Sequence, residues 1–148
     1  MKEITIGDLV TAGVAYQDRQ RNIPTESHQK NLQALIDNIL QPLINQFPAA
    51  EIICGYRSPS IAYYYRDMVM SDHKQGRAAA IWWCGDNLDI EQSVFAMYKW
   101  IVENLEFNTL DIYDTYIDIS YNERYNYKLV SNMSFVHNKH IASRAILD

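Results

Sequence analysis

The sequence has no apolar run long enough to cross a bilayer and no excess of positive charge. A membrane-spanning helix needs about 20 consecutive apolar residues, and the first residues also lack the apolar stretch of a signal peptide. The chain carries 13 Lys and Arg against 18 Asp and Glu, a net charge of −5. A negative chain has no general electrostatic attraction for nucleic acid or anionic lipid. We therefore expect no nucleic-acid partner and no membrane insertion.

Glycine and cysteine are also scarce. The five glycines are scattered, and no internal repeat, low-complexity tract or Gly/Ser-rich linker divides the 148 residues. With 48% apolar and 21% charged residues, the composition is typical of one globular domain. The two cysteines, Cys54 and Cys84, lie in apolar stretches, where a buried free thiol is commoner than a disulfide or a ligand pair.

A long amphipathic helix is predicted over residues 25–47. Thr25 can act as its N-cap, and Glu26 is favourably placed in the first turn. Apolar side chains then recur at helical spacing on one stripe: Leu32, Leu35, Ile36, Ile39, Leu40, Leu43, Ile44 and Phe47. Pro42 should kink or interrupt the helix, because proline has no N–H to donate.

Short apolar runs bounded by turn residues predict the strands. Residues 52–55 and 79–82 form two such runs, and residues 109–113 and 116–121 alternate in the manner of a hairpin. Helices are expected over the Tyr-rich residues 60–70 and after the N-cap Asp89. The predicted fold class is α+β, a single domain with a small, largely antiparallel sheet packed against helices.

Residues 122–148 are predicted to form a C-terminal extension to a domain of residues 1–121. The extension is polar but has more apolar side chains than a free tail should carry: Tyr125, Tyr127, Leu129, Val130, Met133, Phe135, Val136, Ile141 and Ile146. The chain has 11 tyrosines, whose amphipathic rings are enriched at protein interfaces. We expect the extension, with exposed rings among Tyr63, Tyr64 and Tyr65, to act as an interaction arm. A chain ending at Ser120 should then fold without assembling.

The most specific motif is Ser-Asp-His-Lys-Gln-Gly-Arg-Ala-Ala-Ala at residues 71–80, preceded by Gly-Tyr-Arg-Ser-Pro at residues 55–59. These residues resemble the zinc D-Ala-D-Ala carboxypeptidase and endolysin family, whose pattern is roughly Ser-x-His-x-x-Gly-x-Ala-x-Asp after a Ser-Gly-Tyr-Arg-Ser-Pro strand end. Further segments extend the likeness over about residues 7–121, in the same order and spacing: residues 22–24, 31–32, 40–43 and 116–121. The resemblance implies a DD-peptidase-like fold.

That family binds a catalytic zinc through three protein ligands and keeps one position open for water. By resemblance, His73 matches the first ligand, and Arg57 matches the arginine that holds the substrate carboxylate or the developing oxyanion. Ala80 stands at the Asp ligand position and has no donor atom, and Asp118 stands at the second His position. His73 and Asp118 alone supply one ligand fewer than a catalytic zinc site uses.

The proton-accepting acid of the family also departs from the pattern. Thr115 stands at its position, and Asp114, one residue out of register, is the nearest acidic substitute. The resemblance therefore implies a remnant pocket formed by Arg57, His73, Asp114 and Asp118. We expect no catalytic residues and no cofactor in it, and the alternative is a zinc ion on His73 and Asp118.

Each of these residues also has a purely structural interpretation. His73 without its partner ligands is expected to be a hydrogen-bonded, partly buried histidine rather than a weak metal ligand. Arg57 can form an ion pair with Asp118 or Asp114 instead of binding a substrate. Trp82 and Trp83 would point to opposite faces of a strand, so one belongs to the core while the other contacts solvent or a partner.

Three functions remain open from the sequence. The likeness is closest to short family members encoded by bacteriophages and prophages, which implies a non-catalytic structural or adaptor protein of a virion, in the tail, baseplate or capsid. Its partners would be other virion or assembly subunits or further copies of itself, and its location the virion or, before assembly, the host cytoplasm. One alternative is a zinc-dependent peptidoglycan peptidase, either carboxypeptidase or endolysin. Another is a module that binds cell-wall peptide through Arg57 without cutting it.

Overall fold

The structure is a computed structural model that describes residues 2–62, 71–133, 135–136, 139–140 and 143–146. Its helical elements are, in chain order, α1 (Ile6–Thr11), η1 (Tyr16–Arg21), α2 (Glu26–Leu35), η2 (Ile36–Leu40), α3 (Gln41–Gln46), α4 (Pro59–Ala62), α5 (Ser71–Lys74) and α6 (Ile90–Asn104). Its strands are β1 (Glu51–Cys54), β2 (Ala78–Trp82), β3 (Thr109–Ile112), β4 (Ile117–Ser120), β5 (Leu129–Asn132), β6 (Phe135–Val136), β7 (Lys139–His140) and β8 (Ser143–Ile146).

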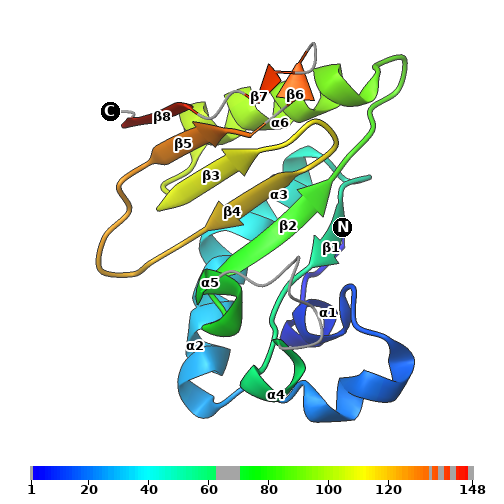
Figure 1. The fold of residues 1–148 in the computed structure, drawn as a ribbon, viewed down its shortest axis with the longest axis vertical. Coiled ribbons are helices and arrows are strands. Elements are labelled where there is room, and N and C mark those ends of the chain that lie inside the picture. Colours follow the sequence, from blue (N-terminus) through cyan, green and yellow to red (C-terminus); the bar gives the residue numbers. More distant parts are fainter. Residues whose placement is uncertain (1, 63–70, 134, 137–138, 141–142, 147–148) are drawn as a thin grey trace.

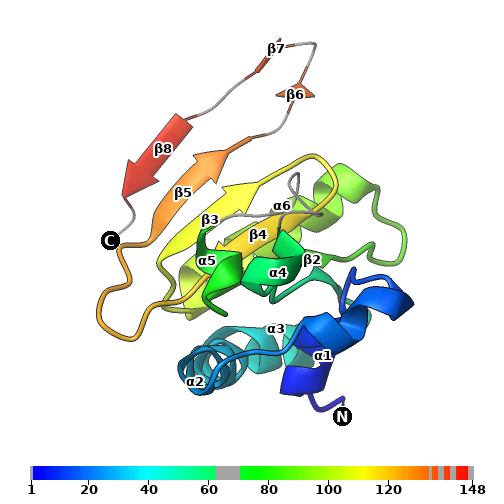
Figure 2. The same ribbon diagram turned by 60° about the horizontal axis from the view of Figure 1, so that its bottom comes forward.

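The strands form one six-stranded sheet in the order β1-β2-β4-β3-β5-β8, and β6 and β7 form a separate hairpin (Figures 1 and 2). The β1–β2, β2–β4, β4–β3 and β5–β8 pairs are antiparallel, whereas β3 and β5 are parallel. The predicted α+β class is confirmed, and the predicted hairpin of residues 109–121 is the β3–β4 pair.

The predicted helix of residues 25–47 is present as α2, η2 and α3. The Thr25 hydroxyl accepts a hydrogen bond from the His28 amide, at 3.2 Å, and so caps the start. The interruption expected from Pro42 takes the form of a π-helical turn, in which the Gln41 amide donates to the Ile36 carbonyl. A π turn just before a proline lets the helix pass the missing N–H without ending.

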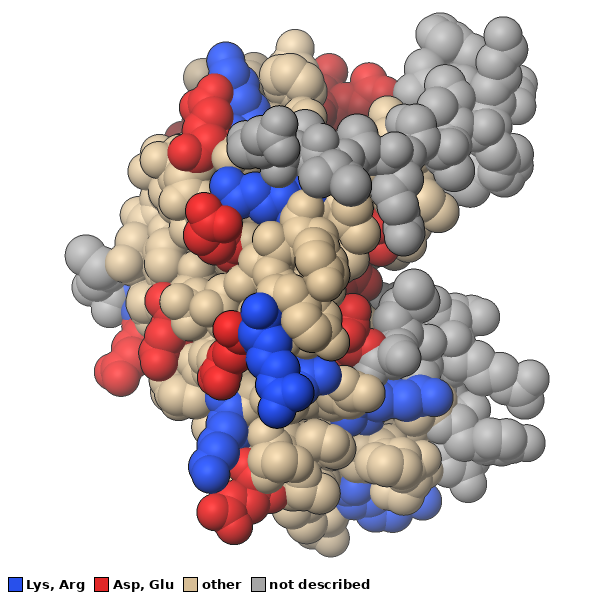
Figure 3. Space-filling view, turned by 90° about the vertical axis from the view of Figure 1, so that its left-hand side faces the viewer, with Lys and Arg blue, Asp and Glu red and all other residues tan. Residues whose placement is uncertain are grey.

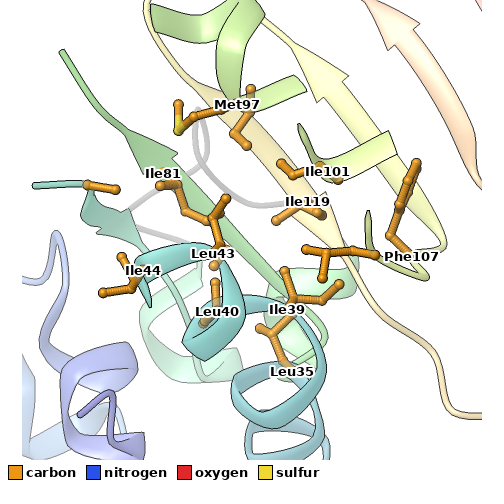
Figure 4. Close-up of a cluster of buried hydrophobic side chains, with 14 of the residues drawn as sticks. Leu35, Ile39, Leu40, Leu43, Ile44, Ile81, Met97, Ile101, Phe107 and Ile119 are labelled. Carbon is orange, nitrogen blue, oxygen red and sulfur yellow. The ribbon is translucent and has the colours of Figure 1, made fainter. Parts of the chain in front are cut away.

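The core lies between one face of the sheet and the helices α2, α3 and α6 (Figure 4). The helix of residues 25–47 contributes its predicted stripe, and α6 adds Met97 and Ile101. From the sheet, Ile81 and Ile119 point into the same cluster, and none of these four side chains is exposed. Because alternate strand residues point to opposite faces, Ala80 and Asp118 lie on the other face of the sheet.

The C-terminal residues contribute to this same sheet. Val130 of β5 belongs to the core cluster, and the Leu129 amide donates to the Asn108 carbonyl at 2.9 Å. The boundary predicted at residue 121 therefore falls between two strands of one sheet. A chain ending at Ser120 would lose Val130 from the core, so removal of the extension is not a clean test of assembly.

Several sequence expectations need correction or lie outside the described residues. Cys54 is buried as expected, but Cys84 is exposed, because it follows β2 in the loop that leads to α6. The helices α1, η1 and α5 were not predicted, since they are too short to show a periodic pattern. Of the helix expected over residues 60–70, the structure describes only the start, in α4, so Tyr63, Tyr64 and Tyr65 lie outside the described residues.

The distribution of charged side chains on the surface agrees with the mixed composition of acidic and basic residues. On the face drawn in Figure 3, acidic and basic side chains are interspersed and do not form a field of one sign. No helix within the described ranges is long and apolar enough to span a membrane. The largest exposed apolar side chains are aromatic: Tyr16, Phe95, Tyr125 and Tyr127 are 83%, 61%, 47% and 56% exposed.

The N-cap of α6 provides a test of the helix assignment. The Asp89 carboxylate accepts from the Gln92 amide at 2.7 Å, and the Gln92 side chain accepts from the Asp89 amide. Asp89→Ala should lower the free energy of unfolding by about 1 kcal/mol, because it leaves an amide of the first turn without its acceptor. Urea denaturation measures this loss. Glu103→Ala, at an exposed position in the last turn, is the control and should change stability much less.

Candidate functional site

The candidate site lies on the face of the sheet opposite the core. Cross-strand register places Cys54 of β1 beside Ala80 of β2, Ala80 beside Asp118 of β4, and Asp118 beside Asp111 of β3. Register partners in an antiparallel pair point to the same face, so these four residues form one row across the sheet. Cys54 joins the row because a bulge shifts the register between Ile52 and Cys54.

The short helix α5 brings His73 to this row. The turn that follows this helix contains Gly76, whose φ of +77° is accessible to glycine at little cost. A side chain at Gly76 would also overlap the His28 carbonyl oxygen and Leu32 of α2. The His73 carbonyl accepts from the Arg57 and Gly76 amides, each at 3.3 Å. The glycine of the 71–80 motif therefore serves to turn the chain from α5 into β2.

Both ring nitrogens of His73 face hydrogen-bond acceptors. Nε2 lies 2.9 and 3.1 Å from the two carboxylate oxygens of Asp118, and Nδ1 lies 2.9 Å from the Gly55 carbonyl oxygen. The Cys54 sulfur lies 3.8 Å from Nδ1. Two acceptors call for two N–H donors, so the geometry fits the charged imidazolium. The His73 side chain is 1% exposed and that of Asp118 is 17% exposed.

This environment changes the pKa of His73 in opposite directions. Burial by itself lowers the pKa, but the hydrogen bond and the charge of Asp118, with contributions from Cys54, raise it overall from 6.5 to about 10. The imidazolium is therefore the form present at neutral pH. A ring that donates from both nitrogens has no lone pair with which to accept a proton or bind a metal ion.

A tyrosine pair borders the two carboxylates. The rings of Tyr113 and Tyr116 stack at 4.5 Å with an interplanar angle of 8°. Burial and the charge of Asp118 raise the pKa of both hydroxyls, that of Tyr116 to about 12. Asp111 and Asp118 are directly opposite each other, an arrangement of like charges that destabilises a sheet. The positive charge of His73 offsets part of this repulsion.

Arg57 lies deeper in the molecule than a substrate-binding arginine would. Its side chain is 1% exposed, and Nη1 donates to the Tyr56 carbonyl at 2.9 Å. A side chain at Gly13 would overlap the guanidinium, so Arg57 packs against the segment between α1 and η1. Asn22 fixes the backbone here, since its side chain donates to the Val10 and Tyr56 carbonyls and accepts from the Ser58 amide.

Of the four residues predicted to share a remnant pocket, His73 and Asp118 are in direct contact. The Arg57 amide bonds to the backbone of His73, whereas its guanidinium packs as described above. Asp114 lies in the turn between β3 and β4, and Thr115 beside it is exposed. Ala80, for which the resemblance implies the Asp ligand position, is the register partner of Asp118. The 71–80 motif thus juxtaposes residues 73, 80 and 118.

These residues do not make a good metal site in their present pairing. His73 Nε2 and Asp118 are the only donors that the 73–80–118 triangle offers, and they bond to each other. A search of the described residues finds no group of three or more His, Cys, Asp or Glu side chains able to hold a metal ion. A catalytic zinc ordinarily takes three protein ligands, so the donor set fits that metal poorly.

Sequence reasoning missed the roles of four residues in the site: Cys54, Tyr113, Tyr116 and Asn22. Cys54 was expected only as a buried free thiol, and the one-residue bulge that brings it into the row has no signal in the apolar run of residues 52–55. The Tyr113–Tyr116 stack was read only as part of a hairpin. Asn22 bonds to carbonyl groups that lie 12 and 34 positions away along the chain. No local sequence pattern predicts contacts of this kind.

Comparison of the chain with protein-family models, with curated proteins and with solved structures finds no match.

The raised pKa of His73 predicts how stability depends on pH. Because the folded-state value of about 10 exceeds the ordinary 6.5, the stabilising contribution is complete below pH 6.5 and is lost as pH rises towards 10. His73→Gln should therefore cost about 3 kcal/mol near pH 6.5 and much less at pH 10. Urea denaturation at pH 6.5, 8 and 10 measures this gap, the difference in free energy of unfolding between the wild-type chain and the variant. Asp118→Asn should remove the same pH dependence, and a gap that stays constant with pH would show that the pair is not ionised.

Proposed function

We propose that this chain is a non-catalytic structural or adaptor protein of a bacteriophage virion, built on a DD-peptidase-like framework that has lost its metal chemistry. Its setting would be the tail, baseplate or capsid, with the host cytoplasm as its location before assembly. The virion setting rests on the resemblance of residues 7–121 to short phage-encoded peptidases. The absence of catalysis rests on the geometry around His73.

The observation that carries the proposal is the pairing of His73 with Asp118. Nε2, the nitrogen available for a metal, is bonded to the Asp118 carboxylate, and Nδ1 is bonded to the Gly55 carbonyl. A metal-bound histidine commonly keeps the second of these bonds, to a backbone carbonyl. In this chain, however, Nε2 is bonded to the Asp118 carboxylate and not to a metal. Ala80, the register partner of Asp118, has no donor atom. The arrangement supports a structural ion pair in place of a zinc centre.

The alternative of a cell-wall peptide module gains less support. Such a module would bind a peptide carboxylate through Arg57, which requires its guanidinium to reach solvent. The Arg57 side chain is 1% exposed and donates to a backbone carbonyl. The residue therefore supports the fold of the 55–59 turn.

Exposed aromatic rings support a role in contacts with other proteins. Tyr125 and Tyr127 stack at 5.3 Å, and both are about half exposed. They lie in the loop that leads into β5, within the predicted interaction arm. Exposed rings of this kind are typical anchors of protein interfaces. An enzyme that hydrolyses peptides would not need these exposed rings.

Restoring the family's ligands tests the alignment behind the proposal. Ala80→Asp combined with Asp118→His should complete a set of three with His73 and raise zinc affinity by about a hundredfold or more. Zinc titration by calorimetry measures the change, with each single substitution as a control that supplies only two donors. No gain in the double variant would mean that residues 80 and 118 are wrongly aligned. Stoichiometric zinc in the wild-type protein, purified without chelator, would favour the peptidase instead.

The tyrosine pair tests the proposed assembly. Tyr125→Ser with Tyr127→Ser should reduce incorporation into phage particles by about tenfold, because two anchors of the interface are lost while the core is untouched. Tyr16→Ser, which removes an even more exposed ring outside the arm, is the control and should have little effect. Quantitative mass spectrometry of purified particles gives the readout. Particles that never contain the wild-type chain would show the virion setting to be wrong.

A further inference from the structure

The two edges of the six-stranded sheet are treated differently by the rest of the chain. At the β1 edge, a bulge breaks the register between Ile52 and Cys54. The segment from α1 to η1 lies against this edge: the Tyr56 amide donates to the Leu9 carbonyl at 2.9 Å, and a side chain at Gly13 would overlap the Ile53 carbonyl oxygen. Bulges and covering loops are the usual protection of a strand edge against added strands.

Within the described residues, the β8 edge has neither a bulge nor a strand paired with its outer side. β8 pairs with β5 in an unbroken register over four residues, from Ile146 opposite Leu129 to Ser143 opposite Asn132. The strand contains no proline and no glycine. It is the last strand of the sheet, and no other described strand pairs with its outer side (Figure 2). Backbone N–H and C=O groups on the outer side of an edge strand are a template for one more strand.

We propose that β8 pairs with β8 of a second copy of this chain, in antiparallel orientation, so that the two sheets become one. A head-to-tail arrangement would require the β8 edge of one copy to meet the β1 edge of the next. The β1 edge is covered, which leaves the β8 edge to meet its own equivalent. Such an isologous contact closes after two copies, as two-fold symmetry requires.

Symmetry also restricts the register. A two-fold axis that relates neighbouring strands of one sheet stands perpendicular to the sheet, so one residue must face its own copy. An axis at Arg144 would place like charges directly opposite each other, which destabilises a sheet. An axis at Ala145 avoids this and places Arg144 opposite Ile146 of the second copy. An axis at Ser143 or Ile146, the ends of β8, would leave only one residue of each strand paired, so the pairing is centred on Ala145.

This inference does not depend on the virion setting or on the fate of the metal site. A dimer through β8 would form in a phage protein, a peptidase or a binding module alike. Its test therefore uses the isolated full-length chain, and its failure leaves the zinc and particle experiments unaffected.

Sedimentation velocity of the wild-type chain provides the first measurement. The proposal predicts a concentration-dependent equilibrium between monomer and dimer with no larger species. A chain that remains monomeric up to about 1 mM, a concentration at which even weak pairing becomes visible, overturns the proposal. Open-ended polymers also overturn it, because they indicate head-to-tail addition.

Cysteine cross-linking locates the axis. Ala145→Cys in a Cys84→Ser background should give a disulfide-linked dimer on mild oxidation, since facing residues in an antiparallel pair have Cα atoms about 4.5–5.5 Å apart. Arg144→Cys in the same background is the matched control, because an axis at Ala145 separates its two copies beyond disulfide range. The first variant should cross-link at least about tenfold faster than the second.

Two controls protect this comparison. Cys54 is buried, so it should not contribute to the cross-link. Hydrogen exchange at the Val130 and Asn132 amides of β5, which face β8, reports whether each variant keeps its β8 pairing. Equal cross-linking of both variants, each with intact protection of β5, would overturn the register centred on Ala145.

Discussion

The ion pair between His73 and Asp118 is the constraint on which this side of the molecule depends. Through one buried imidazolium, the chain joins the end of β1 at Gly55, the short helix α5 and the middle of β4. A helix as short as α5 is not stable alone, so it needs such an attachment. Charge buried at this depth is costly unless it is fully hydrogen-bonded. The Asp118 carboxylate and the Gly55 carbonyl provide these hydrogen bonds to the ring of His73.

Much of the fold could be predicted because its signals are local. The stripe from Leu32 to Phe47, the cap at Asp89 and the apolar runs at residues 52–55 and 79–82 each specify an element through periodicity or a single side chain. The parallel pairing of β3 with β5 could not be predicted, because alternation in residues 125–130 fixes which face is buried and not which strand is the neighbour. Cys84 is exposed because β2 ends at Trp82, although the apolar run continues to Cys84.

The candidate site also has features that could be predicted from the sequence and features that could not. The resemblance to the peptidase family implied that residues 73, 80 and 118 lie together, and the structure has His73 bonded to Asp118 and Ala80 in register with Asp118. It could not reveal that His73 would bond to Asp118 through one nitrogen and to Gly55 through the other. Those contacts depend on a bulge and on a four-residue helix, and both are decided by tertiary packing. The burial of Arg57 could not be predicted for a similar reason. The loop around Gly13, which packs against Arg57, has no sequence pattern.

The parallel β3–β5 pair also affects the order in which the molecule can be completed during synthesis. β3 and β4 form a local hairpin, and β2 can pair with β4 as soon as that hairpin exists. The other side of β3 has to wait until the loop carrying Tyr125 and Tyr127 has left the ribosome, since β5 follows that loop. During this interval Leu110 and Phe107 lack the cover that Val130 supplies to the finished core. A nascent chain that stalls before β5 therefore leaves one edge of β3 unpaired and apolar side chains uncovered, which favours aggregation.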